Sequence, residues 1–139
     1  MLEAKNAEFS FESFKVPRFS FNERNELEGK LKLGFLPSGR YISKTGDFEL
    51  TLNFTTHDAD DKDKVVFELT ALAFFKFSSP IDYEEIPDFF YMNAIAIMFP
   101  YIRAFVSTLT LQANTKLLQL SLMNLAELEQ PLRSNTTVV

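Results

Sequence analysis

The residues that could perform acid–base, nucleophilic or phosphate chemistry are few. His57 is the only histidine among 139 residues, and it stands at the start of an acidic stretch, so a Ser–His–Asp triad has no obvious partners for it. The absence of cysteine excludes a disulfide, a thiolate zinc site and a cysteine nucleophile. Four glycines form no phosphate-binding loop. We therefore predict no enzyme activity, no metal and no cofactor.

Two clusters of carboxylates remain to be explained. Four aspartates between residues 58 and 63 invite a calcium-binding interpretation, but Lys62 takes the third ligand position of an EF-hand loop, and its glycine and terminal glutamate are missing. We interpret this stretch as a solvated charge run. Glu84, Glu85 and Asp88 precede or open a predicted helix, where negative charge is favourable to the helix dipole. Neither cluster requires acid–base catalysis.

Length and charge narrow the class of protein. A chain of 139 residues is typical of a single domain, here residues 1–139, with a core of its own. The formal net charge of −5 has the wrong sign for a general nucleic-acid binder. The N-terminal residues lack the basic and then apolar run of a secretory signal, and a cysteine-free chain fits a reducing compartment. We expect a cytoplasmic protein.

The elements that would position any site begin with a sheet. Apolar and polar residues alternate over 9–21, 31–35, 48–54 and 65–77, which predicts a four-stranded antiparallel sheet. In the first strand the parity of the phenylalanines changes twice around Pro17, as expected of a bulged edge strand. Residues 37–39 and 44–47 have turn chemistry, and residues 57–64 predict a charged hairpin loop.

The fourth strand has an unusual second face. Its residues there change from mixed to apolar at Leu72 and Phe74, although one face of such a sheet should stay polar. Two interpretations remain open: this face meets a partner or ligand, or the following loop folds over it.

A long apolar helix is predicted over residues 87–112, with Pro87 in its first turn. Between residues 89 and 111 the only charge is Arg103, which allows three interpretations. A transmembrane span has the right length, but Asn93, Pro100 and several hydroxyl residues oppose it. Complete burial is difficult in so small a domain. We favour a helix packed between the sheet and another subunit, without membrane insertion.

The remaining residues predict short elements. Leu118, Leu120 and Leu122 alternate as in an extended segment. Asn124 and Glu127 have the spacing of a capping box and would open a short helix that Pro131 ends. We expect residues 1–6 and 133–139 to be frayed.

Two motifs connect the chain to a known family. The helix contains Phe99-Pro100-Tyr101-x-Arg103, and Leu118-x-Leu120-x-x-x-Asn124 follows it. Together with an aromatic, bent first strand and Asp47-Phe48-Glu49 at the third, this arrangement resembles the SecB family of bacterial protein-export chaperones over about residues 7–128.

The resemblance implies an α+β fold with a four-stranded sheet, a long helix and a short C-terminal segment, assembled as a homotetramer, a dimer of dimers with helices between the sheets. It also implies ATP-independent holding of unfolded or precursor polypeptides in apolar grooves, in protein export and translocation. By position, it implies client-binding residues at Phe74, Phe75, Phe77, Phe89, Phe90 and Tyr91. The oligomer-interface helix would present Phe99, Tyr101, Arg103 and Phe105.

Some positions depart from the family pattern. Family members that dock on the ATPase SecA use acidic residues of the exposed sheet face, and Arg18, Asn22 and Thr70 occupy those positions here. These departures argue against SecA as a partner more than against client holding. Divergent relatives also act alone or beside toxin–antitoxin pairs. The alternative to a chaperone is an oligomeric α+β protein that binds a small apolar ligand.

Overall fold

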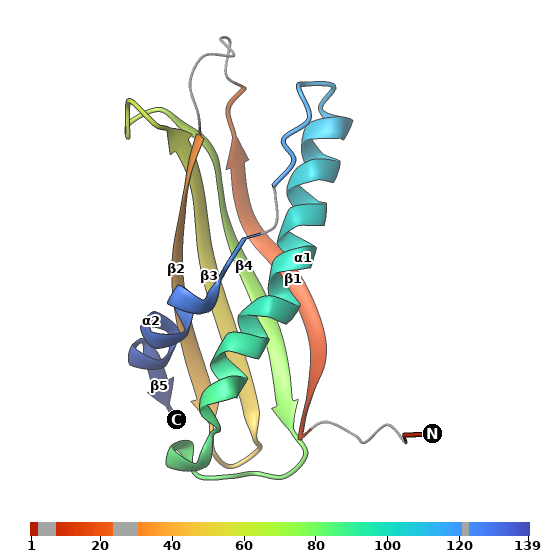
Figure 1. The fold of residues 1–139 in the computed structure, drawn as a ribbon, viewed down its shortest axis with the longest axis vertical. Helices are drawn as coiled ribbons and strands as arrows, with labels where there is room; N and C mark the ends of the chain where they lie inside the picture. Colours follow the sequence, from red (N-terminus) through yellow and green to blue (C-terminus); the bar gives the residue numbers. More distant parts are fainter. Residues whose placement is uncertain (3–7, 24–30, 121–122) are drawn as a thin grey trace.

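The computed structural model describes residues 1–2, 8–23, 31–120 and 123–139 (Figure 1). A twisted sheet is followed by one long helix that lies across a single face of it. The strand order is β1-β4-β3-β2-β5, and the first four strands pair antiparallel. The elements are β1 (Phe9–Phe21), β2 (Leu31–Ile42), β3 (Asp47–Asp58), β4 (Val65–Phe77), η1 (Tyr83–Glu85), α1 (Asp88–Gln112), η2 (Ala126–Leu128), α2 (Glu129–Ser134) and β5 (Thr136–Val138). The predicted α+β class is confirmed.

Two irregularities in β1 explain its changing parity. The register against β4 shifts between Phe11 and Ser13 and again between Lys15 and Arg18. Each shift returns the next phenylalanine to the side of the sheet that α1 covers. The cross-strand partners of these phenylalanines are all residues of the buried face: Phe77, Phe75, Ala73, Leu69 and Phe67 oppose Phe9, Phe11, Phe14, Phe19 and Phe21. The predicted bulged edge strand is confirmed.

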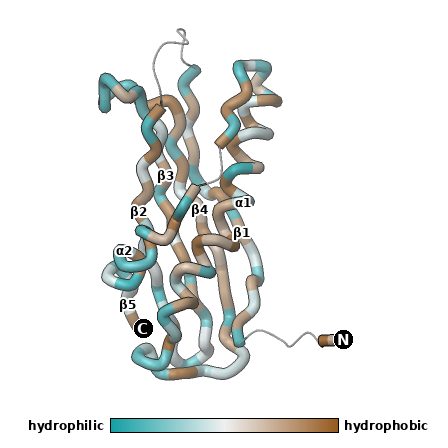
Figure 2. The backbone as a smooth tube through the Cα atoms, viewed as in Figure 1, coloured by the Kyte–Doolittle hydropathy of each residue, from teal (hydrophilic) through white to brown (hydrophobic). Residues whose placement is uncertain are grey.

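The core lies between the sheet and α1. Figure 2 shows hydrophilic residues at the β3–β4 turn and around α2. Phe90 of α1 is fully buried, with its ring centroid 4.8 Å from those of Phe48 and Phe77 and 4.9 Å from that of Phe9. Aromatic residues on three strands thus close around the start of the helix. This packing fixes the direction in which α1 crosses the sheet.

The helix itself runs as predicted. Pro87 occupies the N-cap, where its missing N–H costs nothing. Among the described residues, α1 is the one helix long and apolar enough to cross a membrane by length and composition. In the structure one of its faces packs on the sheet, through Phe90, Tyr91, Ala94, Ile95, Met98, Phe99, Ile102, Val106 and Thr110.

The turn predicted at residues 37–39 is wrong. β2 continues through Pro37 and Gly39, which pair with Leu52 and Leu50 of β3. Pro37 is tolerated because β2 has only one long neighbouring strand, β3, and its other side meets only the short β5, which begins opposite Gly39. The turn at residues 44–47 is confirmed, with Gly46 at a φ of 79° that suits a residue without Cβ.

The end of the chain also differs from its prediction. Pro131 lies in the first turn of α2 instead of ending a helix, and residues 133–139 are ordered instead of frayed. The end of the chain is held in place because Leu132 is fully buried and because β5 pairs in parallel with Gly39–Tyr41. The sheet therefore has a short fifth strand. Of the N-terminal residues expected to fray, those from 3 to 6 lie outside the described residues.

Candidate functional site

The face of α1 that points away from the sheet remains largely apolar. Its exposed residues include Phe89, with 51 % of its surface accessible, and Leu111, with 63 %. Between them the accessible residues at helical spacing are small: Ala96, Pro100 and Ala104. We call this face the outer stripe of α1, defined by Phe89, Asn93, Ala96, Pro100, Ala104, Thr108 and Leu111. An apolar stripe of this length with small residues at its centre permits close approach by another apolar chain.

A connector, described over residues 113–120 and 123–125, returns along one side of α1. Asn114, with a φ of 58°, reverses the chain after the helix. Two hydroxyl residues of α1 then hold the returning backbone: Thr110 Oγ1 accepts the N–H of Leu118 at 3.0 Å, and Ser107 Oγ donates to the carbonyl of Leu118 at 3.3 Å. Thr115 Oγ1 also donates to the Thr110 carbonyl at 3.0 Å, so polar contacts at Thr115 and Leu118 fix the connector to the helix.

Between the connector and α1 lies a groove, which we call the α1 groove. It comprises two adjoining hollows of about 360 and 310 Å³ that share Pro100 and Arg103 as a border. The first is lined in addition by Met92, Asn93, Ala96, Phe99, Met123, Asn124, Leu125 and Ala126. The second is lined by Ala104, Ser107, Gln119 and Leu120. The groove follows the helix axis, as a site for an extended chain would.

The polar groups of the α1 groove suit a polypeptide backbone. Pro100 has no N–H, so the carbonyl of Ala96, one turn earlier, lacks its helical donor. Arg103 is the only charged residue among the described residues that line the groove. Met92 of α1 and Met123 of the connector line the same hollow. Methionine adapts to varied apolar side chains. The groove therefore offers an acceptor, a donor and a deformable apolar wall.

The six residues predicted to touch clients do not form one surface. Phe75, Phe77, Phe90 and Tyr91 are buried in the core between sheet and helix. Phe89 is accessible and belongs to the outer stripe. The sixth residue, Phe74, is partly accessible, but on a different surface from Phe89. The client-binding role of the set stays a prediction.

Phe74 lies on the opposite, outer face of the sheet. It is half-buried, as is Leu72 on the same face, and the Lys15 Nζ sits 5.5 Å from the centre of its ring. The loop after β4 goes instead to the other side, where Ile81 packs on the core and donates its N–H to the hydroxyl of Tyr41. Of the two interpretations of this apolar face, the covering loop is wrong.

The four residues predicted for the oligomer interface point to different sides of α1. Phe99 is buried, 5.8 Å from Phe35 between ring centroids, and belongs to the core. Tyr101 is 45 % accessible, and its ring lies beside Phe11 of β1. Arg103 borders the α1 groove, as described above.

Phe105 completes that set. It is half-buried against two rings, with centroids 5.2 Å from Phe19 and 6.4 Å from Phe67. In the Phe-Pro-Tyr-x-Arg motif, Phe99 therefore lies in the core and Pro100 in the outer stripe. Tyr101 lies on the β1 side, and Arg103 borders the groove.

Sequence reasoning missed Met92 and Met123 as groove residues because it predicted no path for the connector. The signal that could have found it is the pair Ser107 and Thr110, one turn apart on an apolar helix.

A clamp fixes α2 beside the start of α1. The Arg133 guanidinium contacts Asp88 at 3.0 Å and Glu129 at 2.8 Å, and lies 5.0 Å from the ring of Tyr91. Burial, with Tyr83 as the next cause, raises the pKa of Tyr91. Asp88, expected to serve the helix dipole, also pairs with this arginine. The clamp positions the far end of the connector and so the α1 groove.

The aspartates of the β3–β4 loop support its own backbone. Asp58 Oδ1 accepts the N–H of Asp60 at 2.9 Å, and Asp61 Oδ1 accepts the N–H of Asp63 at 3.0 Å. These are local turn contacts. They account for two of the four aspartates without a cation.

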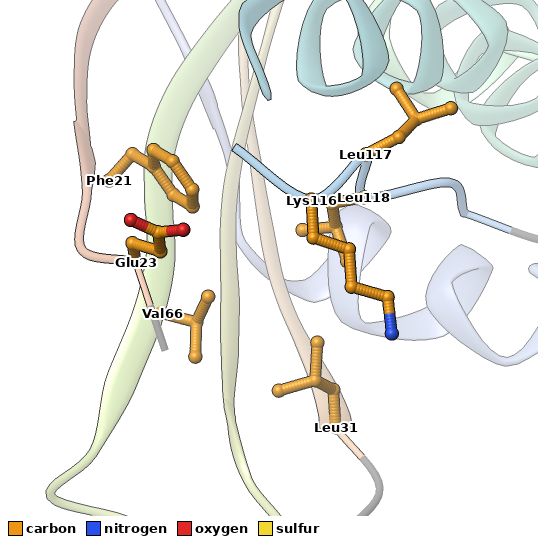
Figure 3. Close-up of a pocket in the computed structure, with 7 residues that line it drawn as sticks. All are labelled: Phe21, Glu23, Leu31, Val66, Lys116, Leu117 and Leu118. Atoms are coloured by element: carbon orange, nitrogen blue, oxygen red, sulfur yellow. The ribbon is translucent and has the colours of Figure 1, made fainter. Parts of the chain in front are cut away.

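A smaller pocket opens where β1, β2 and β4 meet the connector (Figure 3). Its volume is about 120 Å³, and Glu23 and Lys116 border it from the end of β1 and from the connector. The remaining lining is apolar: Phe21, Leu31, Val66, Leu117 and Leu118. Sites for drug-sized ligands occupy roughly 300–1,000 Å³. This pocket therefore gives no support to the small-ligand alternative.

Comparisons with known proteins agree with this architecture. The model of the family SecB, "Preprotein translocase subunit SecB", matches residues 6–132. Among solved structures, the Mycobacterium tuberculosis Rv1957 SecB-like chaperone, in complex with a ChAD peptide from the Rv1956 HigA1 antitoxin, has 16 % identity and a TM-score of 0.66, covering 84 % of this chain and 88 % of that one.

A second structure, a protein of unknown function from Streptococcus agalactiae, has 11 % identity and a TM-score of 0.48, covering 83 % of this chain and 98 % of that one. A likeness this low carries no argument. No curated protein sequence matches the chain.

Proposed function

Because this chain belongs to the SecB family, we propose that it is an ATP-independent chaperone that holds unfolded polypeptides in the α1 groove. The observation that carries the proposal is the groove itself: two adjoining hollows along a helix, with apolar walls, one carbonyl without its helical donor and one arginine. Such a surface binds backbone and varied apolar side chains together, which is what an unfolded client presents.

The charge of the groove sets a preference. The chain carries a net charge of −5, yet within the part of the chain that the structure describes the one charged group bordering the groove is Arg103. A guanidinium among apolar walls favours carboxylates and backbone carbonyls of the client. We expect apolar segments that contain an acidic residue to bind more tightly than those that contain a basic one.

The antitoxin peptide in the Rv1957 structure supports a polypeptide client, since that SecB-like chaperone is in complex with it. We infer that the present chain holds its clients without SecA, whether they are export precursors or an unstable antitoxin. On the outer sheet face Arg18 is exposed beside Glu68, with 3.9 Å between the charged atoms, in place of a free acidic residue. We place this role in the cytoplasm.

We also propose that the outer stripe of α1 pairs with a second copy, in a tetramer built as a dimer of dimers. The stripe would otherwise expose Phe89 and Leu111 together on one helix. Leu111 belongs to the stripe but is not among the residues that line the α1 groove, so Leu111→Glu should place a charge in the interface and dissociate the assembly. Light scattering after size exclusion would measure the mass. A monomeric wild type at micromolar concentration would contradict the oligomer.

The chaperone proposal is tested by aggregation of a chemically denatured client, followed by light scattering without ATP. We expect the wild type to suppress aggregation at a stoichiometric ratio. Met92→Glu, in the groove, should raise the concentration needed about tenfold. Leu36→Glu is the matched control, because Leu36 is also exposed apolar surface, 59 % accessible against 40 % for Met92, but lies on the far face of the sheet. Equal losses in both variants, or no suppression by the wild type, would refute the proposal.

A further inference from the structure

The outer edge of β2 is occupied by the chain's own residues 135–139, which we call the resident strand; it includes β5 and lies beside β2 in Figure 1. The N–H of Gly39 donates to the Asn135 carbonyl at 3.2 Å, the N–H of Val139 donates to the Tyr41 carbonyl at 2.9 Å, and the N–H of Ser43 donates to the Val139 carbonyl at 3.2 Å. The backbone of β2 is thus satisfied at successive alternate residues by one extended segment.

Most of this pairing depends on backbone rather than side chains. Val138 and Val139 are 49 % and 59 % accessible, and Thr137 is exposed. Three side chains add to the pairing: the Asn135 Nδ2 donates to the Pro37 carbonyl at 3.2 Å, the Ser43 Oγ donates to the Val139 carbonyl at 3.2 Å, and Thr136 lies opposite Gly39, where a Cβ would lie 2.7 Å from the Thr136 Oγ1. The missing Cβ leaves room for one small side chain. A strand edge that binds a segment through its backbone, with a size limit at one side chain only, can accept segments of many sequences.

We propose that the outer edge of β2 is a second polypeptide-binding site, which takes an extended segment in parallel register by strand addition. The resident strand is its intramolecular occupant, and a client segment displaces it. The inference rests on the proposed function, since it takes unfolded polypeptides as the clients. An unfolded chain supplies the free backbone N–H and C=O groups that strand addition requires. A small or β-branched residue opposite Gly39 is the expected preference.

The anchor of the resident strand explains how it can open without unfolding the domain. Leu132 is fully buried, and Arg133 is held by the clamp, so α2 stays in place while residues 135–139 detach. Three residues of parallel pairing at the edge of a sheet belong to the least stable parts of a fold. A short tether gives the strand an effective concentration on the order of millimolar. A client already held in the α1 groove competes at a similar local concentration, whereas a free peptide does not.

The first test opens the edge in the full chain. Residues 135 and 139 bond to β2, so the N–H of Thr137, midway between them, faces β2 as well. Thr137→Pro removes that N–H, and Thr137→Ser keeps it as the matched control. The probe is a fluorescein-labelled peptide of residues 134–139, followed by anisotropy. We expect at least tenfold tighter binding to Thr137→Pro than to Thr137→Ser. Equal binding by the two variants would overturn the proposal.

The second test closes the edge. Arg40 and Thr137 are Cα partners in a chain without cysteine, so Arg40→Cys with Thr137→Cys permits one disulfide across the pair. Oxidised protein should suppress client aggregation at least threefold less well than the same protein after reduction, and urea unfolding of both checks the fold. Equal suppression in both states refutes the edge site alone. Loss of suppression in both states refutes the proposed function.

Discussion

Thr110 gives the sharpest test of how the connector is held, because one hydroxyl performs two tasks in a buried position. It donates to the Val106 carbonyl at 2.9 Å and accepts the N–H of Leu118 at 3.0 Å, and the residue has no accessible surface. Thr110→Val keeps the shape and removes both contacts. The helical carbonyl loses only a supplementary donor, whereas the connector loses the acceptor of its Leu118 N–H.

The expected cost follows from that asymmetry. A buried donor left without a partner costs about 1–3 kcal/mol, against about 1 kcal/mol for an average hydrogen bond. With a urea m-value of about 2 kcal/mol/M, the unfolding midpoint should fall by about 0.5–1.5 M. Far-UV circular dichroism is the probe, since the chain has no tryptophan. Protein concentration must be held fixed because assembly would add to the apparent stability.

Thr108→Val is the matched control, because Thr108 is exposed on the same helix two residues earlier. Its midpoint should shift by less than about 0.3 M, as for most surface substitutions. If Thr110→Val shifts the midpoint no more than Thr108→Val does, the hydroxyl does not hold the connector, and the stated origin of the α1 groove is wrong.

Three further substitutions test the clamp and the sheet edge. Arg133→Met should lower the free energy of unfolding by about 1–2 kcal/mol, less in 1 M salt, and a salt-independent loss in urea titrations would exclude the ion pairs as its cause. The pKa of Tyr91 is raised in the folded chain, so as the pH rises the phenol loses its proton in the unfolded chain first. The contribution of this pKa difference to the free energy of unfolding is therefore complete below pH 10 and is lost progressively above it. Tyr91→Phe should therefore show a shallower fall of the unfolding midpoint between pH 10 and 11, and parallel curves would contradict this. Gly39→Ala puts a Cβ 2.6 Å from the Phe48 ring and should lower the free energy of unfolding by about 1–3 kcal/mol. In the control Gly34→Ala the nearest neighbouring atom is 3.9 Å from the new Cβ, so this change should be neutral to stabilising. Equal unfolding midpoints of the two variants would refute the close approach at Gly39.

Much of the fold follows from local patterns. Alternation placed the four long strands, and the two changes of parity in β1 correctly predicted its irregular register. Local turn chemistry failed at Pro37 and Gly39, because pairing with β3 along the whole of β2 outweighs it. The prediction that the end of the chain is frayed also failed, because Asn135 donates a hydrogen bond to the carbonyl of Pro37, 98 residues earlier. No window of local sequence contains such a contact.

The candidate site was less predictable than the fold. Apolarity predicted α1 as a surface for other chains but could not divide its residues between core, outer stripe and groove. Phe90 and Phe89 are neighbours of identical type, yet the first is fully buried and the second half exposed, because the helix turns 100° between them. The groove requires the connector, whose course depends on the hydroxyls of Ser107 and Thr110. Those contacts are visible only in three dimensions.

The central claim is that unfolded polypeptide binds in the α1 groove, and the four methionines test it most directly. Met92 and Met123 line the groove, Met98 is fully buried beneath it, and Met1 lies at the start of the chain. With ¹³C-methyl methionine, titration with a permanently unfolded client should shift and broaden the Met92 and Met123 resonances while Met98 and Met1 stay in place. Unchanged Met92 and Met123 resonances at a client concentration that saturates binding would contradict the account.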